Sequence, residues 1–157
     1  MVGAMLRRSH LLALFLVAGC GRDEPAPPAE PKRGAEAPTQ REPTEAERRT
    51  AADAAAALAR YYRMIEAGDY RSAYRMRTRG RVDAERFAAN YAAYEHFSAV
   101  VGSPSFPADA DGFTYVQMPV MITGRFKGGK PFGSSGNVTV RRPANGAAGS
   151  WKVLAES

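Results

Sequence analysis

The sequence predicts an α+β domain in which helices come first and an antiparallel sheet follows. Between residues 44 and 95, apolar side chains recur every three or four positions, the period of helices that bury one face. From residue 96 onward apolar residues alternate with polar ones, and glycine and proline separate the runs. Helices followed by strands, without regular alternation of the two, are typical of α+β folds with an antiparallel sheet.

The first 19 residues have the pattern of a secretory signal peptide. A basic head with Arg7 and Arg8 precedes an apolar run over residues 11–18 and the small residue Gly19. This run is much shorter than the roughly 20 apolar residues that a membrane-spanning helix needs. We therefore expect residues 1–19 to direct export and then to be removed.

The only cysteine of the chain, Cys20, follows directly. The segment Val17-Ala18-Gly19-Cys20 resembles the lipobox of bacterial lipoproteins. The resemblance implies cleavage between Gly19 and Cys20, acylation of Cys20 by chains such as palmitate, and a protein anchored to the inner or outer membrane, facing the periplasm. The alternative is an ordinary signal peptide followed by a chance cysteine. A lipidated Cys20 would leave no thiol for a disulfide.

Residues 20–43 are expected to be a disordered linker. Six prolines alternate there with alanine and charged residues, which provide little apolar surface to bury. In a polyproline conformation at about 3 Å per residue, this segment would reach up to about 70 Å. The expected organisation is therefore a signal peptide over 1–19, a lipidated linker over 20–43 and one domain over 44–157.

The charge balance favours anionic envelope surfaces as partners. Removal of the signal peptide, with its two arginines and no acid, lowers the formal net charge of +6 to +4. We expect no nucleic-acid partner because the protein is exported. No group of His, Cys, Asp or Glu has metal-ligand spacing, and no glycine-rich phosphate loop precedes a helix, so neither a metal nor a cofactor is expected.

Three helices are expected in the first half of the domain. Thr44 and Glu47 have the spacing of a capping box at the start of the first helix, and Gly68 is a stop signal at its end. A short second helix is expected from the cap Asp69 to about residue 76. A third is expected over about residues 83–95, with Asp83 as its N-cap.

About four strands are expected in the second half. Pro119 lies inside the longest of them and cannot donate to a strand ladder, which favours an edge position or a bulge. Residues 127–130 have the composition of a tight hairpin loop, and residues 104–112 are rich in turn formers. We expect the strands over residues 96–101, 113–126, 132–142 and 150–156.

The order of these motifs resembles the nuclear transport factor 2-like superfamily over about residues 44–157. The similarity lies in the pattern Tyr61-Tyr62-x-x-Ile65-x-x-Gly68-Asp69-Tyr70 and in the later strand residues around Val120 and Trp151. It implies three helices packed on a curved sheet that together form a cone with a mostly apolar pocket. Ligand-binding, enzymatic and purely assembling members exist, so this fold does not specify a function.

A pocket of this kind would be lined by aromatic and aliphatic side chains with a few polar groups. Gln117, between apolar neighbours in the longest strand, is the best polar candidate for orienting a ligand. The alternative is that the aromatic residues form a filled core. The candidate lining residues are Tyr62, Ile65, Phe87, Tyr91, Tyr115, Gln117, Val120 and Trp151.

A run of arginines is a second candidate site. Guanidinium groups bind phosphate and carboxylate in bidentate geometry, so the run fits anionic lipids, lipopolysaccharide or wall polymer. The alternative is an ordinary solvated face. The run consists of Arg71, Arg75, Arg77, Arg79 and Arg81.

The sequence therefore favours an envelope lipoprotein whose domain binds or interacts without catalysis. One alternative is an isomerase- or dehydratase-like enzyme that uses Asp53 or His96, the two titratable residues not explained as caps, turns or element ends. A third hypothesis is a dimer formed through the sheet. A buried acid in the cone would favour the enzyme, whereas a filled cone with an exposed apolar sheet face would favour the dimer.

Overall fold

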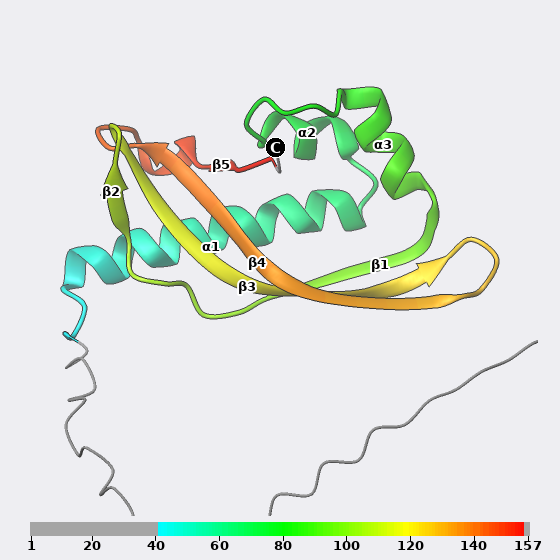
Figure 1. Ribbon diagram of the computed structural model, residues 1–157, viewed down its shortest axis with the longest axis horizontal. Coiled ribbons are helices and arrows are strands. Elements are labelled where there is room, and N and C mark those ends of the chain that lie inside the picture. The colour runs from blue at the N-terminus through cyan, green and yellow to red at the C-terminus, as the bar shows by residue number, and fades with distance from the viewer. Residues whose placement is uncertain (1–40, 156–157) are drawn as a thin grey trace, which may run out of the picture. The chain divides into compact units, whose positions relative to one another are not determined.

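Helices α1 to α3 precede a curled antiparallel sheet of strands β1 to β5 in the computed structural model, which describes residues 41–155 (Figure 1). The α+β class and the antiparallel sheet are confirmed. The expected signal peptide and nearly all of the expected linker lie outside the described residues. The elements are α1 (Glu45–Glu66), α2 (Tyr70–Arg75), α3 (Ala84–Ala92), β1 (Tyr94–Val101), β2 (Ala108–Ala110), β3 (Phe113–Phe126), β4 (Pro131–Pro143), a 3-10 turn η1 (Ala148–Ser150) and β5 (Lys152–Val153).

The sheet has the order β1-β3-β4-β5, with β2 also paired to β3. Along β3, Val116, Met118 and Val120 are buried, whereas Gln117, Pro119 and Met121 between them are exposed. This alternation defines an inner face, which packs on α1, and an outer face. The pairing of Val116 with Val140 and of Met118 with Val138 extends the inner face onto β4.

The first helix begins at the expected capping box. The Glu47 amide donates to the Thr44 hydroxyl (3.2 Å), and the Thr44 amide donates to the Glu47 carboxylate (2.7 Å). The Arg41 guanidinium and these bonds from Thr44 together hold the pKa of the Glu47 carboxyl at about 2. Because the cap satisfies otherwise orphaned amides, it fixes where α1 starts and therefore which of its faces meets the sheet.

The expected stop at Gly68 is also present. The Gly68 amide donates to the Ile65 carbonyl (3.0 Å) and the Asp69 amide to the Met64 carbonyl (2.8 Å), with Gly68 at φ 76°. These are the two hydrogen bonds of a Schellman motif, which needs a left-handed residue at this point. Asp69 then caps α2 through the Ser72 hydroxyl and amide, which hold the pKa of its carboxyl below the ordinary value.

The core lies between α1 and the inner face of the sheet. Side chains from α1, α2 and α3 meet side chains from β3, β4 and β5 there, so all parts of the described domain share one core. Burial of this apolar surface is the main favourable term that holds the sheet on the helix. Its buried members are Ala54, Ala57, Leu58, Tyr61, Tyr62, Ile65, Ala73, Phe87, Val116, Met118, Val120, Val140, Trp151 and Val153.

The third helix begins at the expected cap Asp83 but ends at Ala92, before the expected residue 95. The chain enters β1 at Tyr94 instead, and the register against β3 shifts between Tyr94 and His96, which marks a bulge. Gly124 lies opposite this bulge, where a Cβ atom would overlap the His96 carbonyl oxygen and lie 2.7 Å from the Phe132 ring. Only glycine fits this close approach of backbone and ring.

Pro119 does not lie in an edge strand, because β3 is flanked by β1 and β4. The Gly102 amide donates to the Pro119 carbonyl (2.8 Å), and Gly102 is the first residue after β1 ends. In an antiparallel strand the N–H and C=O of one residue point to the same side. Gly102 and Pro119 therefore meet through a single backbone hydrogen bond just past the end of β1, and the absent N–H of Pro119 costs only the reciprocal bond at that last position.

The strand β2 was not predicted. Its three residues are all exposed, so they have no apolar alternation, and they were assigned to a turn-rich segment that included Asp109. Asp111 and Gly112 form the tight turn between β2 and β3, with φ values of 50° and 77°. Both residues are left-handed, as in the turns that suit the twist of hairpins. The sheet therefore has five strands where about four were expected.

Candidate functional site

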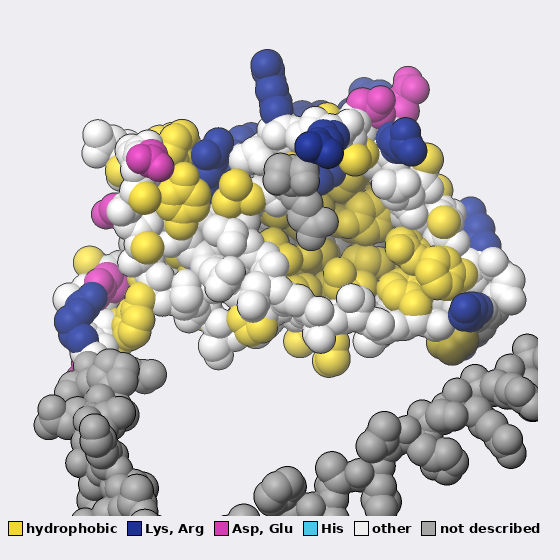
Figure 2. All heavy atoms as spheres, in the orientation of Figure 1, with side chains coloured by type: hydrophobic (Ala, Val, Ile, Leu, Met, Phe, Trp, Pro, Cys, Tyr) yellow, Lys and Arg dark blue, Asp and Glu magenta, His cyan; other side chains and the backbone are white. Residues whose placement is uncertain are grey.

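Most of the side chains expected to line a pocket are packed in the core. Tyr62, Ile65, Phe87, Val120 and Trp151 are each at most 5% exposed. Figure 2 shows hydrophobic side chains gathered on the inner side of the sheet, in the hollow between the strands and the two short helices. Because these five side chains are almost inaccessible to solvent, they belong to the packed core and are not the hydrophobic surface that is visible in the hollow.

The remaining three candidates are less buried. Tyr91 is partly buried, and its ring centroid lies 4.9 Å from that of Phe87. Gln117 is exposed to solvent on the outer face of β3. Tyr115, two residues earlier, has the same strand parity and pairs with Arg141 across β4. Neither Tyr115 nor Gln117 therefore joins the inner aromatic cluster, because alternate strand residues point to opposite faces.

The two candidates for acid–base chemistry lie on opposite sides of the sheet. Asp53 is exposed on α1, which covers the inner face. His96 is exposed on β1 and has the parity of the outer-face residue Val100. A general acid and base must both reach the same reacting group, and these positions do not allow it. Among the buried groups, burial raises the pKa of the Tyr61 phenol, so this hydroxyl stays protonated at neutral pH.

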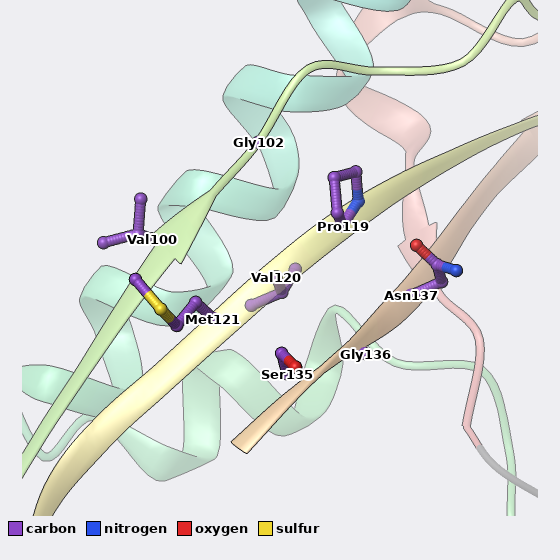
Figure 3. Close-up of a pocket in the computed structure, with 8 residues that line it drawn as sticks. All are labelled: Val100, Gly102, Pro119, Val120, Met121, Ser135, Gly136 and Asn137. Carbon is purple, nitrogen blue, oxygen red and sulfur yellow. The ribbon is translucent and has the colours of Figure 1, made fainter. Parts of the chain in front are cut away.

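A shallow depression of about 400 Å³ lies on the outer face (Figure 3). Val100 and Met121 pair across β1 and β3 there, and they are 59% and 52% exposed. Pro119 and Asn137 lie beside them, and α1 lies behind the strands in this view. The depression is open and mostly apolar, with no ionisable side chain in its lining.

A groove of about 690 Å³ is the most chemically distinctive surface feature of the described domain. It lies where residues 77–79 run beside β5, held by a parallel bridge between Arg77 and Val153. Among the residues that the structure describes, four of its lining side chains are cationic and none is acidic. The lining consists of Arg77, Thr78, Arg79, Phe113, Arg141, Pro143, Ser150, Lys152, Leu154 and Ala155.

Three of the four cations are held in place by contacts that do not neutralise them. The Arg141 guanidinium lies 4.2 Å from the centroid of the Phe113 ring, and that of Arg77 lies 4.9 Å from the Phe87 ring. The Lys152 ammonium donates one hydrogen bond to the Arg75 carbonyl (2.8 Å). No ion pair joins any of these cations to a carboxylate within residues 41–155.

The arginine run of the sequence is thus divided by the fold. Arg77 and Arg79 line the groove, whereas Arg71, Arg75 and Arg81 are exposed and do not line it. Sequence reasoning missed the other two cations of the groove, Arg141 and Lys152. The register pairs Arg141 with Lys152 across β4 and β5, and each lies next to a buried valine, Arg141 after Val140 and Lys152 before Val153. A last strand was expected over residues 150–156, but its register against β4 was not, and only this register brings the two cations together.

The described residues contain no group of three or more His, Cys, Asp or Glu side chains placed to hold a metal ion. Within the same part of the chain, none of the helices combines the length and apolar character needed to cross a bilayer. The chain matches no protein-family model and no curated protein sequence.

Proposed function

We propose that this protein is a lipid-anchored envelope protein whose domain binds anionic ligands without transforming them. The observation that carries the binding role is the groove in which Arg77, Arg79, Arg141 and Lys152 meet without an acid among the described lining residues. The anchor is supported by the lipobox-like segment ending at Cys20, and the cone-like, nuclear transport factor 2-like architecture by the order of the helices and the curled sheet.

Cations that have no ion-pair partner among the described residues and that share one concavity act together on a ligand. A groove with low-dielectric walls and charge of one sign concentrates the field and attracts counter-ions. At physiological ionic strength, screening acts over about 8 Å, so only charges within one such groove reinforce each other strongly. The exposed Arg71 and Arg81, which do not line the groove, add to the net charge but do not form such a concavity.

Binding without catalysis is favoured because the described lining of the groove contains no general base. Within residues 41–155 its lining has cations, the hydroxyls of Thr78 and Ser150, and apolar groups, but no carboxylate or histidine. The Thr78 hydroxyl oxygen accepts the Ala155 amide (2.9 Å), and the Ser150 hydroxyl donates to the Ala147 carbonyl (2.7 Å). A hydroxyl nucleophile needs an adjacent base to activate it, and neither hydroxyl has one in the part of the chain that the structure describes.

The test is a pair of charge variants and a matched pair outside the groove. Arg79→Gln with Arg141→Gln should weaken the binding of inorganic phosphate, measured by calorimetry at low salt, by about 10-fold or more, because charge-assisted hydrogen bonds contribute about 1.5–3 kcal/mol. The control pair, Arg71→Gln with Arg81→Gln, removes the same net charge from exposed arginines outside the groove.

The control pair should change phosphate affinity by less than about 2-fold because screened surface charges contribute little at a distance. Equal losses of phosphate affinity in the two double variants would show that the overall positive charge attracts phosphate and that the groove does not bind it specifically. Absence of phosphate binding by the unsubstituted protein would contradict the proposal itself.

A second candidate function is self-association through the outer face of the sheet. The specific observation is the adjacent exposed pair Val100 and Met121 over the shallow depression (Figure 3). A stable dimer buries about 800 Å² on each partner, so neighbouring polar outer-face residues would have to take part.

Met121→Glu should then make the protein monomeric in sedimentation experiments, because it places a charge at the centre of the contact. Ala52→Glu adds the same charge to an exposed position of α1 and should leave the association unchanged. A protein that sediments as a monomer at every accessible concentration would rule out this second function.

A further inference from the structure

The groove is not uniformly polar. Beside its cations it is lined by the apolar side chains of Phe113, Pro143, Leu154 and Ala155. Phe113, Leu154 and Ala155 are partly buried, and Pro143 is exposed at the end of β4. A ligand that fills this groove would therefore meet charge and apolar surface at the same time.

The cations are arranged to accept a ligand with little further ordering. Arg141 and Arg77 each lie over an aromatic ring, a contact that restrains the side chain and leaves its charge in place. Neither guanidinium donates a hydrogen bond to another described residue, so their N–H groups are available to a ligand. Lys152 uses one of its three donors on the Arg75 carbonyl, which leaves two. Groups already held in place lose less conformational entropy on binding.

We propose that the groove binds amphiphiles that carry a phosphomonoester head on an alkyl chain. This inference rests on the proposed function and narrows it to one ligand class. A phosphomonoester carries a charge of about −1.5 to −2 at neutral pH and three acceptor oxygens, which suits several convergent donors. The alkyl chain lies against Phe113, Pro143 and Leu154, where it removes apolar surface from water.

The dimensions of the groove agree with such a ligand. Ligand sites commonly have volumes of about 300–1,000 Å³, and the groove of about 690 Å³ lies inside this range. This volume is larger than a single phosphate ion occupies, so the groove has room for more than an anionic head group. A phosphate head with the first part of a chain uses both the charge and the remaining apolar lining.

A homologous series of soluble ligands tests this proposal. Ethyl, butyl and hexyl phosphate share one head group, and calorimetry with the full chain carrying Cys20→Ser measures their affinities without a competing attached lipid. Affinity should rise by about 2- to 4-fold for each added methylene, since a buried methylene contributes about 0.8 kcal/mol, until the apolar lining is covered. Hexyltrimethylammonium, with the same chain and a cationic head, should not bind.

Two variants separate the contributions of head and chain. Leu154→Ser should flatten the dependence on chain length while ethyl phosphate binds as before. Arg79→Gln, at an exposed position of the groove, should weaken all three phosphates by the same factor. If Leu154→Ser lowers the stability of the domain, the series of ethyl, butyl and hexyl phosphate still tests the proposal, because it uses a protein whose groove is unchanged.

The outcomes distinguish this inference from the proposed function. Equal affinities for ethyl, butyl and hexyl phosphate would overturn the amphiphile proposal and leave anion binding intact. Comparable binding of hexyltrimethylammonium would overturn it as well, because the head group would then have no role. If none of the three phosphates binds at low salt, the proposed function fails together with the inference.

Discussion

Replacement of Trp151 by alanine is expected to lower the free energy of unfolding by about 3–5 kcal/mol. Trp151 is 2% exposed and is among the largest fully buried side chains of the core. It lies between η1 and β5, so its ring attaches the end of the described chain to the core. Because a domain of this size is typically stable by only about 5–15 kcal/mol, this one cavity removes a large share of the total. Urea unfolding followed by circular dichroism measures the loss.

Trp151→Phe is the matched control. The Trp151 indole N–H and the Nε of Arg142 are buried without a hydrogen-bond partner among the described residues, and the Arg142 guanidinium lies 5.0 Å from the indole centroid. Phenylalanine keeps a ring beneath Arg142 and removes one unsatisfied donor, and such a donor carries a desolvation cost of about 1–3 kcal/mol. We expect Trp151→Phe to lose less than half as much stability as Trp151→Ala. Equal losses would show that the indole makes an essential contact that phenylalanine cannot replace.

Local chemistry made much of the fold predictable. The caps at Thr44, Asp69 and Asp83 depend on side chains that bond to amides three residues away, so their signals are complete in a short stretch of sequence. The limits of β3, residues 113–126, were also predicted, because its buried parity is continuous and glycines follow it. These features need no knowledge of the partner strands.

The errors arose where pairing with other strands, and not the local sequence, determines the structure. Pro119 was expected at an edge or a bulge because its own residue type forbids a ladder bond, yet it lies in the regular, central part of the sheet, opposite the point where β1 ends at Val101. The end of α3 was placed too late because Tyr94 continues the aromatic stripe of the helix. In the structure Tyr94 pairs with Phe126 in the sheet, so tertiary pairing outweighs the local helical pattern.

The groove could not be predicted for a similar reason. Arg77 and Arg79 belong to one visible run, but Arg141 and Lys152 lie more than 60 residues later and reach the same surface only through the β4–β5 register and the bridge at Val153. The sequence showed a charged run and could not show which of its members share a concavity with distant cations. Arg77 also stacks on Phe87, so its replacement affects packing as well as charge.

Replacement of Cys20 by serine is expected to move the protein from the membrane fraction to the soluble fraction. The prediction follows from the segment Val17-Ala18-Gly19-Cys20, which lies outside the described residues, and from the chemistry of lipidation, which serine cannot replace in a lipobox-like sequence. One acyl chain gives only marginal binding to a bilayer, whereas two or more give stable attachment. The change should therefore be close to all-or-none, and mass spectrometry of the unsubstituted protein should find an acylated Cys20 at its N-terminus.

A wash with concentrated salt distinguishes membrane attachment through the lipid from membrane attachment through the basic groove. At about 1 M salt the screening length falls to about 3 Å, which removes electrostatic binding to anionic lipids but leaves acyl chains inserted. The unsubstituted protein should stay with the membrane through this wash and leave it in detergent. Ala26→Ser, a small-to-hydroxyl change in the linker, should behave in the same way as the unsubstituted protein. Release of the unsubstituted protein by salt alone, or an unmodified cysteine in its mass spectrum, would show that surface charge holds it to the membrane and that Cys20 does not.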